Sequence, residues 1–241
     1  MNITEQNDLI EKAKVWFRAT TLSAHLHNTL KLKDEKEFDA NPFLAPYLAV
    51  FLTGELTPKS VAQALTLPRV LGSSITTSFG TGMQKFITDV LKNAFGSTTQ
   101  GIDIEFIDCI DGRKKYCQVK LGPNTINKDD ITTIDGHFKT AKNLGRTNSI
   151  RVSVDDLMVG IIYGENNQLN GHYKALRDKH SYPVVIGKEF WCRLTGAEDF
   201  YDRLIQAIAS VALEANGKAT IEQVVETLSS SDLVRKLARA P

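Results

Sequence analysis

An acid, an amide and a lysine occur in two neighbouring segments that alternate polar and apolar residues. Asp103 lies in the first segment, and Gln118 and Lys120 lie two residues apart in the second. Carboxylate and amide oxygens suit a hard cation such as Mg²⁺, which also binds waters and phosphate oxygens. A nearby lysine can offset the charge that builds on a phosphate during hydrolysis. These residue types at this spacing therefore predict metal-dependent hydrolysis of a phosphodiester.

The two segments predict a β-hairpin that brings these side chains together. Residues 102–109 and 115–121 alternate with the period of a strand, and an Asp-Gly pair between them is a strong turn signal. Side chains two apart in a strand point to the same face. We therefore expect Asp103 and Glu105 on the face that carries the amide and the lysine. A merely solvated polar face is the alternative interpretation of the same pattern.

The sequence after the hairpin indicates that these strands lie inside a sheet. A polar helix is expected at 125–144, a nearly continuous apolar run at 151–163 is typical of an interior strand, and a short strand is expected at 182–187. Acids and a lysine that face inward at the centre of a sheet need partners, and a metal ion with a phosphate would supply them. The whole pattern predicts an α/β fold.

Several of these residues match a known nuclease signature. Asp103 followed by Gln118-x-Lys120 resembles the PD-(D/E)xK signature, with glutamine in place of the second acid. Two longer runs are similar to the small type II restriction endonucleases that cut GG(A/T)CC or GGNCC: Gln118-Val-Lys-Leu-Gly-Pro-Asn-Thr-Ile-Asn-Lys-Asp-Asp130 and Gly187-Lys-Glu-Phe-Trp191. The likeness extends over roughly residues 52–209.

This resemblance implies a restriction-endonuclease-like fold, in which helices flank a central mixed β-sheet. The expected single endonuclease domain has a helical N-terminal part (1–78), a catalytic α/β core (79–195) and C-terminal helices (196–241). The implied activity is Mg²⁺-dependent cutting of both strands of a short palindromic site in double-stranded DNA. Its implied role is host defence, with a cognate DNA methyltransferase as the functional counterpart. One active site per chain and a symmetric DNA site imply a homodimer.

Two alternatives remain open at this point. A structure-specific repair or junction-resolving nuclease would share the same signature, and a non-catalytic DNA-binding module would tolerate the glutamine.

An amide oxygen is neutral and a weaker metal ligand than a carboxylate. Glu105 is expected to supply the missing charge, so the expected metal ligands are Asp103, Gln118 and Glu105, and Lys120 completes the catalytic set. Gln84 and His137 lie on expected helices next to this site and are candidates to support the metal-binding and catalytic residues.

Basic residues gather after the hairpin although the net charge is only +1. Nine lysines and arginines and three aspartates occur from Arg113 to Arg151, and a local basic surface of this kind suits DNA binding. The expected DNA contacts are Asn124, Asn127, Lys128, Arg69, Arg146, Arg151 and Lys188. Candidates for reading guanine are Arg146, Arg151, Lys188 and Arg193. Arg69 belongs to a Ser/Thr/Gly-rich segment, 68–82, which is expected to be a loop that either contacts phosphates or only connects.

The cysteine spacing, residues 1–8 and the lengths of the apolar segments indicate where the protein acts. Three cysteines without CxxC spacing indicate neither a zinc site nor a disulfide framework. Residues 1–8 lack a basic region and an apolar run, so no secretion signal is expected, and no segment is apolar enough to span a membrane. We therefore expect a cytoplasmic protein with no membrane partner, and the resemblance to restriction endonucleases implies a prokaryotic one.

Overall fold

The computed structural model of the protein describes residues 3–239. The chain divides into two compact units, Met1–Trp16 with Gly80–Ile208 and Phe17–Phe79 with Ala209–Pro241. Within the described residues, the first unit contains all the strands and the second is helical. The expected catalytic core, 79–195, falls almost entirely in the first unit. The expectation that the whole chain acts as one endonuclease domain stays a prediction.

The first unit is built on a mixed β-sheet, as predicted. The described strands form a single five-stranded sheet in the order β1-β2-β3-β4-β5. These strands are β1 (Ala94–Gly96), β2 (Ile104–Ile107), β3 (Lys114–Lys120), β4 (Leu157–Ile161) and β5 (Val184–Ile186). The pairs β1–β2 and β2–β3 are antiparallel, whereas β3–β4 and β4–β5 are parallel. The expected hairpin therefore lies at the centre of the sheet, and β3 is the strand at which the pairing changes direction.

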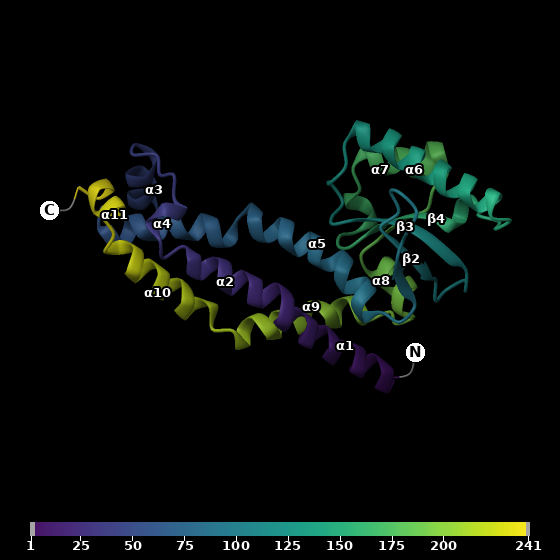
Figure 1. Cartoon of the computed structure of the whole chain (residues 1–241), viewed down its shortest axis with the longest axis horizontal. Coiled ribbons are helices and arrows are strands. Elements are labelled where there is room, and N and C mark those ends of the chain that lie inside the picture. Colours follow the sequence, from purple (N-terminus) through teal and green to yellow (C-terminus); the bar gives the residue numbers. More distant parts are fainter. Residues whose placement is uncertain (1–2, 240–241) are drawn as a thin grey trace. The chain divides into compact units, whose positions relative to one another are not determined.

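Helices cover both faces of this sheet. One face packs against α6 (Lys128–Thr147) and α7 (Gly171–His180), and the other packs against α8 (Lys188–Thr195) (Figure 1). Gly160 of β4 lies so close to α8 that an added Cβ would be 2.2 Å from the ring of Phe190. Because Gln118 and Lys120 pair with Val159 and Ile161 of β4, they lie on the α6 and α7 face.

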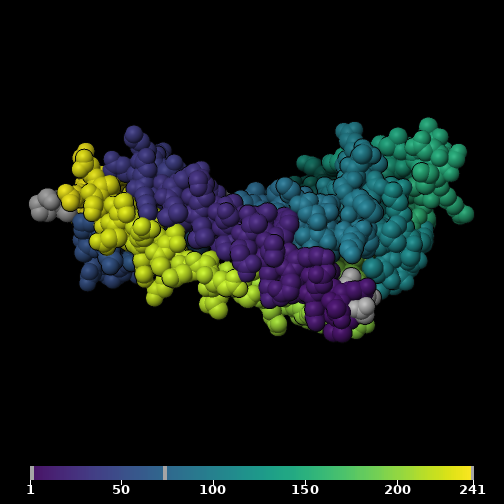
Figure 2. All heavy atoms as spheres, turned by 60° about the horizontal axis from the view of Figure 1, so that its bottom comes forward, coloured from purple at the N-terminus to yellow at the C-terminus, as the bar shows by residue number. Residues whose placement is uncertain are grey.

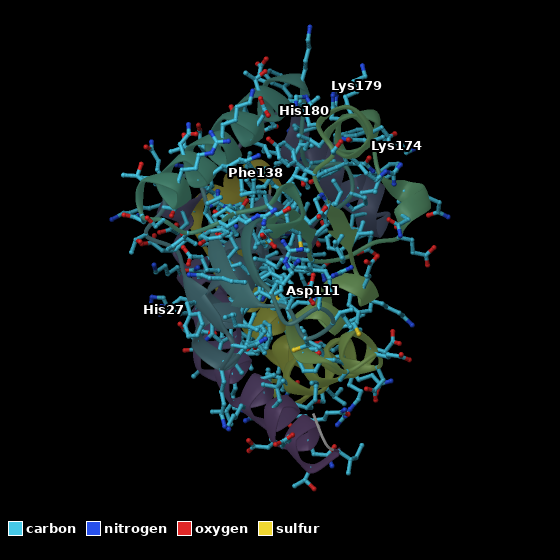
Figure 3. The ribbon with its side chains drawn as sticks, turned by 90° about the vertical axis from the view of Figure 1, so that its right-hand side faces the viewer. His27, Asp111, Phe138, Lys174, Lys179 and His180 are labelled. Carbon is cyan, nitrogen blue, oxygen red and sulfur yellow. The ribbon has the colours of Figure 1, made fainter. Side chains whose placement is uncertain are left out.

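Aromatic side chains fill the space between the layers. Phe138 of α6 meets the ring of Tyr182 edge to face, with centroids 4.8 Å apart, and Figure 3 shows Phe138 near His180 on the α6 and α7 side. On the opposite face Phe190 and Trp191 are buried, as expected from the sequence, and Trp191 donates a hydrogen bond to the carbonyl of Ile162 (2.9 Å). The apolar surface that these side chains bury is the main source of stability for the sheet.

Side-chain caps fix where the helices next to the sheet begin. Asn127 accepts hydrogen bonds from the backbone N–H groups of Asp129 and Asp130 and so starts α6. Asn170 caps α7 in the same way. Gly187, with φ of +55°, makes the sharp turn from β5 into α8.

The second unit consists of packed helices. They include α2 (Ser23–Lys31), α3 (Leu44–Thr53), α4 (Pro58–Leu71), α10 (Gly217–Ser229) and α11 (Asp232–Leu237). Figure 2 shows α10 and α11, in yellow, beside the purple and blue helices of the same unit. The unit boundaries fall within or at the ends of three long helices, α1 (Ile3–Phe17), α5 (Ser73–Val90) and α9 (Phe200–Glu214). The short helical turns of the chain are Arg18–Leu22, Glu35–Glu37, Val154–Asp156 and Asn166–Gln168.

The expectation of a loop at 68–82 is wrong. Helix α4 continues to Leu71 and α5 starts at Ser73, because Ile75, Phe79 and Met83 recur every four residues and form an apolar helix face. The helix that carries Gln84, α5, ends at Val90, and Ala94–Gly96 then pair with β2 as strand β1. Among the described residues, no helix is both long enough and apolar enough to cross a membrane.

Candidate active site

The carboxylate of Asp103 is attached to the middle of the neighbouring strand. Its Oδ2 atom accepts a hydrogen bond of 2.7 Å from the backbone N–H of Val119. The backbone N–H of Asp103 also donates to the carbonyl of Cys117 at 3.0 Å, which extends the β2–β3 pairing past the end of β2. Asp103 is therefore held beside the segment of β3 that carries Gln118 and Lys120, as the hairpin pattern predicts.

The surroundings of Asp103 disfavour its charge unless a cation is near. The residue as a whole is exposed, but its carboxyl group lies against β3, and this burial raises the pKa of Asp103. The hydrogen bond from Val119 and the charges of Lys120 and His137 lower the pKa, but burial has the larger effect. A bound cation would therefore stabilise the ionised form of this carboxylate.

Gln118 lies on the same strand and is almost completely buried, with 4% of its surface exposed. Its Nε2 atom is 2.8 Å from Nδ1 of His137 on α6. Gln84 of α5 donates a hydrogen bond of 3.2 Å from Nε2 to the carbonyl of Val119. The structure thus brings both residues that were expected next to the site onto β3, Gln84 at Val119 and His137 at Gln118.

Lys120 ends β3 and is half-buried. In the part of the chain that the structure describes, no side chain or backbone group forms a hydrogen bond or ion pair with its ammonium group. Its charge nevertheless acts on Asp103. The ammonium is therefore available to a ligand such as a phosphate.

Glu105 shares the strand face of Asp103, but its carboxylate is already occupied. Ser97 donates a hydrogen bond of 2.6 Å to one oxygen, and the ammonium of Lys114 is 2.6 Å from the other. The hydrogen bond from Lys114 to Glu105 raises the pKa of Lys114. Glu105 is therefore not brought to Asp103 in this structure. Consistent with this, no three His, Cys, Asp or Glu side chains gather as metal ligands among residues 3–239.

The loop after Lys120 is fixed by residues that the sequence did not single out. Thr125 Oγ1 donates to the carbonyl of Gly122 at 2.9 Å, and the hydroxyl of Tyr173 donates to the same carbonyl at 3.2 Å. Asn170 Nδ2 donates to the carbonyl of Ile126 at 2.9 Å. A signal for Asn170 was present, because asparagine before a glycine and a helical segment is typical of an N-cap. The Gly-Pro-Asn-Thr run thus forms a defined loop at the end of β3.

Three of the expected DNA contacts lie on this loop and the start of α6. Asn124 and Lys128 are exposed there, close in sequence to Lys120. Asn127 is exposed as well, but its side-chain oxygen is used to cap α6. Asn124 and Lys128 are therefore the predicted contacts that can reach a DNA backbone next to the catalytic residues.

The other expected DNA contacts lie elsewhere. Arg146 is in the last turn of α6, and Arg151 lines a cavity of about 550 Å³ with Lys114 and Tyr116, near the start of β3. Lys188 forms a surface ion pair with Asp202 at 2.6 Å. Arg69 belongs to the second unit, where its guanidinium lies 5.9 Å from the ring centroid of Phe38.

A second charged group lies on the opposite face of β3. Lys115, with 1% of its surface exposed, donates a hydrogen bond to the carboxylate of Asp111. Figure 3 shows Asp111 well away from the α6 and α7 layer. Lys115 also donates to the carbonyl of Asp155 at 3.2 Å. Arg193, a candidate for reading guanine, forms an ion pair of 2.7 Å with the buried carboxylate of Asp108. These charges are paired within the protein.

A comparison with models of protein families matches residues 19–216 to the family described as "Type II restriction endonuclease EcoO109I". The chain belongs to this EcoO109I family. The match includes Asp103, Gln118 and Lys120, and the α/β architecture with a mixed sheet agrees with the family. A comparison with curated proteins found no match. As a member of the EcoO109I family, the protein is a type II site-specific nuclease whose substrate is DNA.

Proposed function

We propose that this EcoO109I-family nuclease requires Mg²⁺ and hydrolyses both strands of a short palindromic site, GG(A/T)CC or GGNCC, in host defence. The observation that supports this proposal is the hydrogen bond from Val119 to Asp103, which holds the acid beside Gln118 and Lys120. We also propose that the enzyme acts in a prokaryotic cytoplasm with a cognate DNA methyltransferase as its functional counterpart.

The residues present fit a magnesium ion. Mg²⁺ usually takes one or two protein carboxylates and fills its other positions with waters and phosphate oxygens. Asp103 offers a carboxylate whose ionisation burial disfavours, and Gln118 offers an amide oxygen from the adjacent strand. We propose these two residues as the ligands; Glu105 would join them only by leaving Ser97 and Lys114. When bound, the ion would act as a Lewis acid toward the scissile phosphate.

The protein's own groups would position the DNA and offset its charge. The ammonium of Lys120 has no partner among the described residues, so it is available to contact the scissile phosphate as charge develops there. Gln84 holds the backbone of β3 at Val119 and thereby keeps Gln118 and Lys120 at a fixed spacing. Asn124 and Lys128 would bind the flanking phosphates, which sets the register of the duplex.

We propose base reading by the more distant basic residues. Arg146 and Arg151 are candidates for base reading, whereas Arg69 is proposed only as a DNA contact. Lys188 can exchange its exposed ion pair with Asp202 for a DNA contact at little cost. Arg193 would first have to leave the buried carboxylate of Asp108, and this makes it the least available of the candidates.

We further propose a homodimer in which the whole chain acts as one endonuclease domain. Two identical active sites related by a two-fold axis match the symmetry of a palindromic site. Helix α3 and the residue before it expose several large apolar side chains, which suit contact with a second copy: Phe43, Tyr47, Val50 and Phe51. Phe51→Glu is expected to give a monomer in analytical ultracentrifugation, and a dimeric variant would rule out this surface as the contact.

Digestion of a mapped plasmid tests the activity. With Mg²⁺, discrete fragments that end at GG(A/T)CC or GGNCC are expected, and EDTA should abolish them. Cutting only at branched or damaged DNA would favour a repair or junction nuclease. Binding without cutting would favour a non-catalytic DNA-binding module.

A further inference from the structure

The contact between Gln118 and His137 couples the orientation of the Gln118 amide to the tautomer of the His137 ring. Nε2 of Gln118 lies 2.8 Å from Nδ1 of His137. An amide nitrogen carries two protons and accepts no hydrogen bond, so it can only donate in this contact. Nδ1 of His137 must therefore be the unprotonated, accepting nitrogen, and the ring proton must lie on Nε2.

This donor assignment leaves the amide oxygen of Gln118 as the atom that does not contact His137. Of the two polar atoms of the amide, only the oxygen is a ligand for Mg²⁺. Gln118 is 4% exposed, so water does not compensate a reversed amide. A reversed amide would place its oxygen against the accepting Nδ1 of His137.

The ring of His137 is itself held in place. It packs on Gly101, where an added Cβ would lie 2.1 Å from Cγ of the ring. Its neighbours in the chain also anchor it, because Phe138 is completely buried and α6 is capped at Asn127. Gly101 has φ of +77° and so is suited to glycine on conformational grounds as well.

We infer that His137 is a positioning residue that selects the metal-binding orientation of the Gln118 amide. This inference rests on the proposed function, because it takes Gln118 as a metal ligand. It also explains how a neutral amide can serve at this position. A carboxylate has two equivalent oxygens and needs no such selection, whereas an amide presents a ligand in only one of its two orientations.

The first test examines His137 in the free protein. NMR spectra that correlate ring nitrogens with ring protons should show the Nε2–H tautomer for the neutral ring. The Nδ1–H tautomer would overturn the inference, because the amide oxygen would then accept a hydrogen bond from His137 and would not be available to the metal.

The second test measures Mn²⁺ affinity by isothermal titration calorimetry in two backgrounds. His137→Phe keeps the ring against Gly101 but removes Nδ1, and should lower the affinity of the wild-type background about tenfold or more. In the Gln118→Glu background the same change should alter the affinity by no more than about twofold. His137→Asn, which can place an acceptor oxygen on Cγ, should restore most of the loss. His27→Phe, at an exposed histidine, is the matched control.

The outcomes separate this inference from the proposed function. Equal losses in both backgrounds would show that His137 acts by another route, such as a phosphate contact, and unchanged affinity would show that it does not act on the metal site. Either result overturns the inference while wild-type cleavage still supports the nuclease. A wild-type protein that neither binds Mn²⁺ nor cuts DNA would overturn both. Circular dichroism of each variant confirms that it is folded.

Discussion

Asp103 and Val119 are joined by a hydrogen bond from the strand backbone to the carboxylate, at 2.7 Å. Val119 is the residue between Gln118 and Lys120, so the acid is fixed relative to both of them by one direct contact. We propose that this fixed spacing lets one carboxylate, one amide and one ammonium act together.

Asp103→Asn should abolish cleavage without disturbing the fold. The asparagine oxygen can still accept the hydrogen bond from Val119, whereas the negative charge is lost. We expect the cleavage rate to fall by about a hundredfold or more, the range for disrupted metal sites, while DNA affinity in EDTA stays the same or rises. Single-turnover cleavage and fluorescence anisotropy measure the two quantities. A variant that still cuts at the wild-type rate would remove Asp103 from the site.

Gln118→Glu should cut DNA at least as fast as the wild type. A second carboxylate binds Mg²⁺ more strongly than an amide oxygen. Gln118→Met, which keeps the length of the side chain but has no ligand oxygen, is the matched comparison and should be slower by about tenfold or more. Cleavage rates across a range of Mg²⁺ concentrations check this. A folded but inactive Gln118→Glu variant would contradict a ligand role.

Lys120→Met should lower the cleavage rate by about a hundredfold or more, on the scale of losing one group that stabilises charge in the transition state. Lys120→Arg should recover little, because a guanidinium differs from an ammonium in shape and hydration. The control is Lys139→Met, on the exposed side of α6, where the lysine pairs with Asp135. Rates under single-turnover conditions decide the matter, and equal rates for the two methionine variants would count against Lys120.

Gly122→Ala should weaken both stability and cleavage. The new Cβ would lie 2.6 Å from the ring of Tyr163, so either the ring or the loop after Lys120 must move. Overpacking of this kind costs about 1–3 kcal/mol. Tyr163→Ala in the same chain should recover part of the loss because it removes the clash. Urea denaturation and cleavage of the two single variants and the double variant test this coupling, and strictly additive losses would refute it.

Asp135→Asn should change how stability depends on acid. Burial alone would raise the pKa of Asp135, but hydrogen bonds from Lys139 and Tyr182 outweigh it and lower the pKa below 3.8. The wild-type carboxylate therefore stabilises the fold above pH 3.8, and this contribution is lost as the pH falls through the lower, folded-state pKa. We expect the variant to be less stable by about 1–2 kcal/mol at pH 7. The gap should shrink toward pH 3 in urea denaturation curves, and a gap that widens in acid would refute the assignment.

The sequence predicted the elements that hold the site because strand alternation places side chains on a known face. Asp103, Gln118 and Lys120 follow from that rule alone. The bond between Asp103 and Val119 does not follow from it, because it depends on the exact register at the end of β2. For the same reason the sequence could not show that Glu105 pairs with Ser97 and Lys114.

Other differences arise where composition and periodicity disagree. In 68–82 the serines, threonines and glycines suggested a loop, yet the apolar residues at Ile75 and Phe79 were spaced for a helix. Periodicity determined the outcome, since it decides what can be buried. The contact between His137 and Gln118 joins residues on different elements, α6 and β3, and no local sequence pattern predicts such a contact.

The buried side chain of Lys115, on one face of β3, helps to fix the register of this strand. It therefore also fixes which side chains lie on the other face. A shift of β3 by a single residue would exchange its two faces, so Gln118 and Lys120 would turn toward α8 and Cys117 and Val119 toward α6. The same slip would pull the buried ammonium of Lys115 away from Asp111 and from the carbonyl of Asp155. An unpaired buried charge is so unfavourable that misaligned forms are excluded. The interior lysine on the far side thus keeps Gln118 and Lys120 facing the α6 and α7 layer.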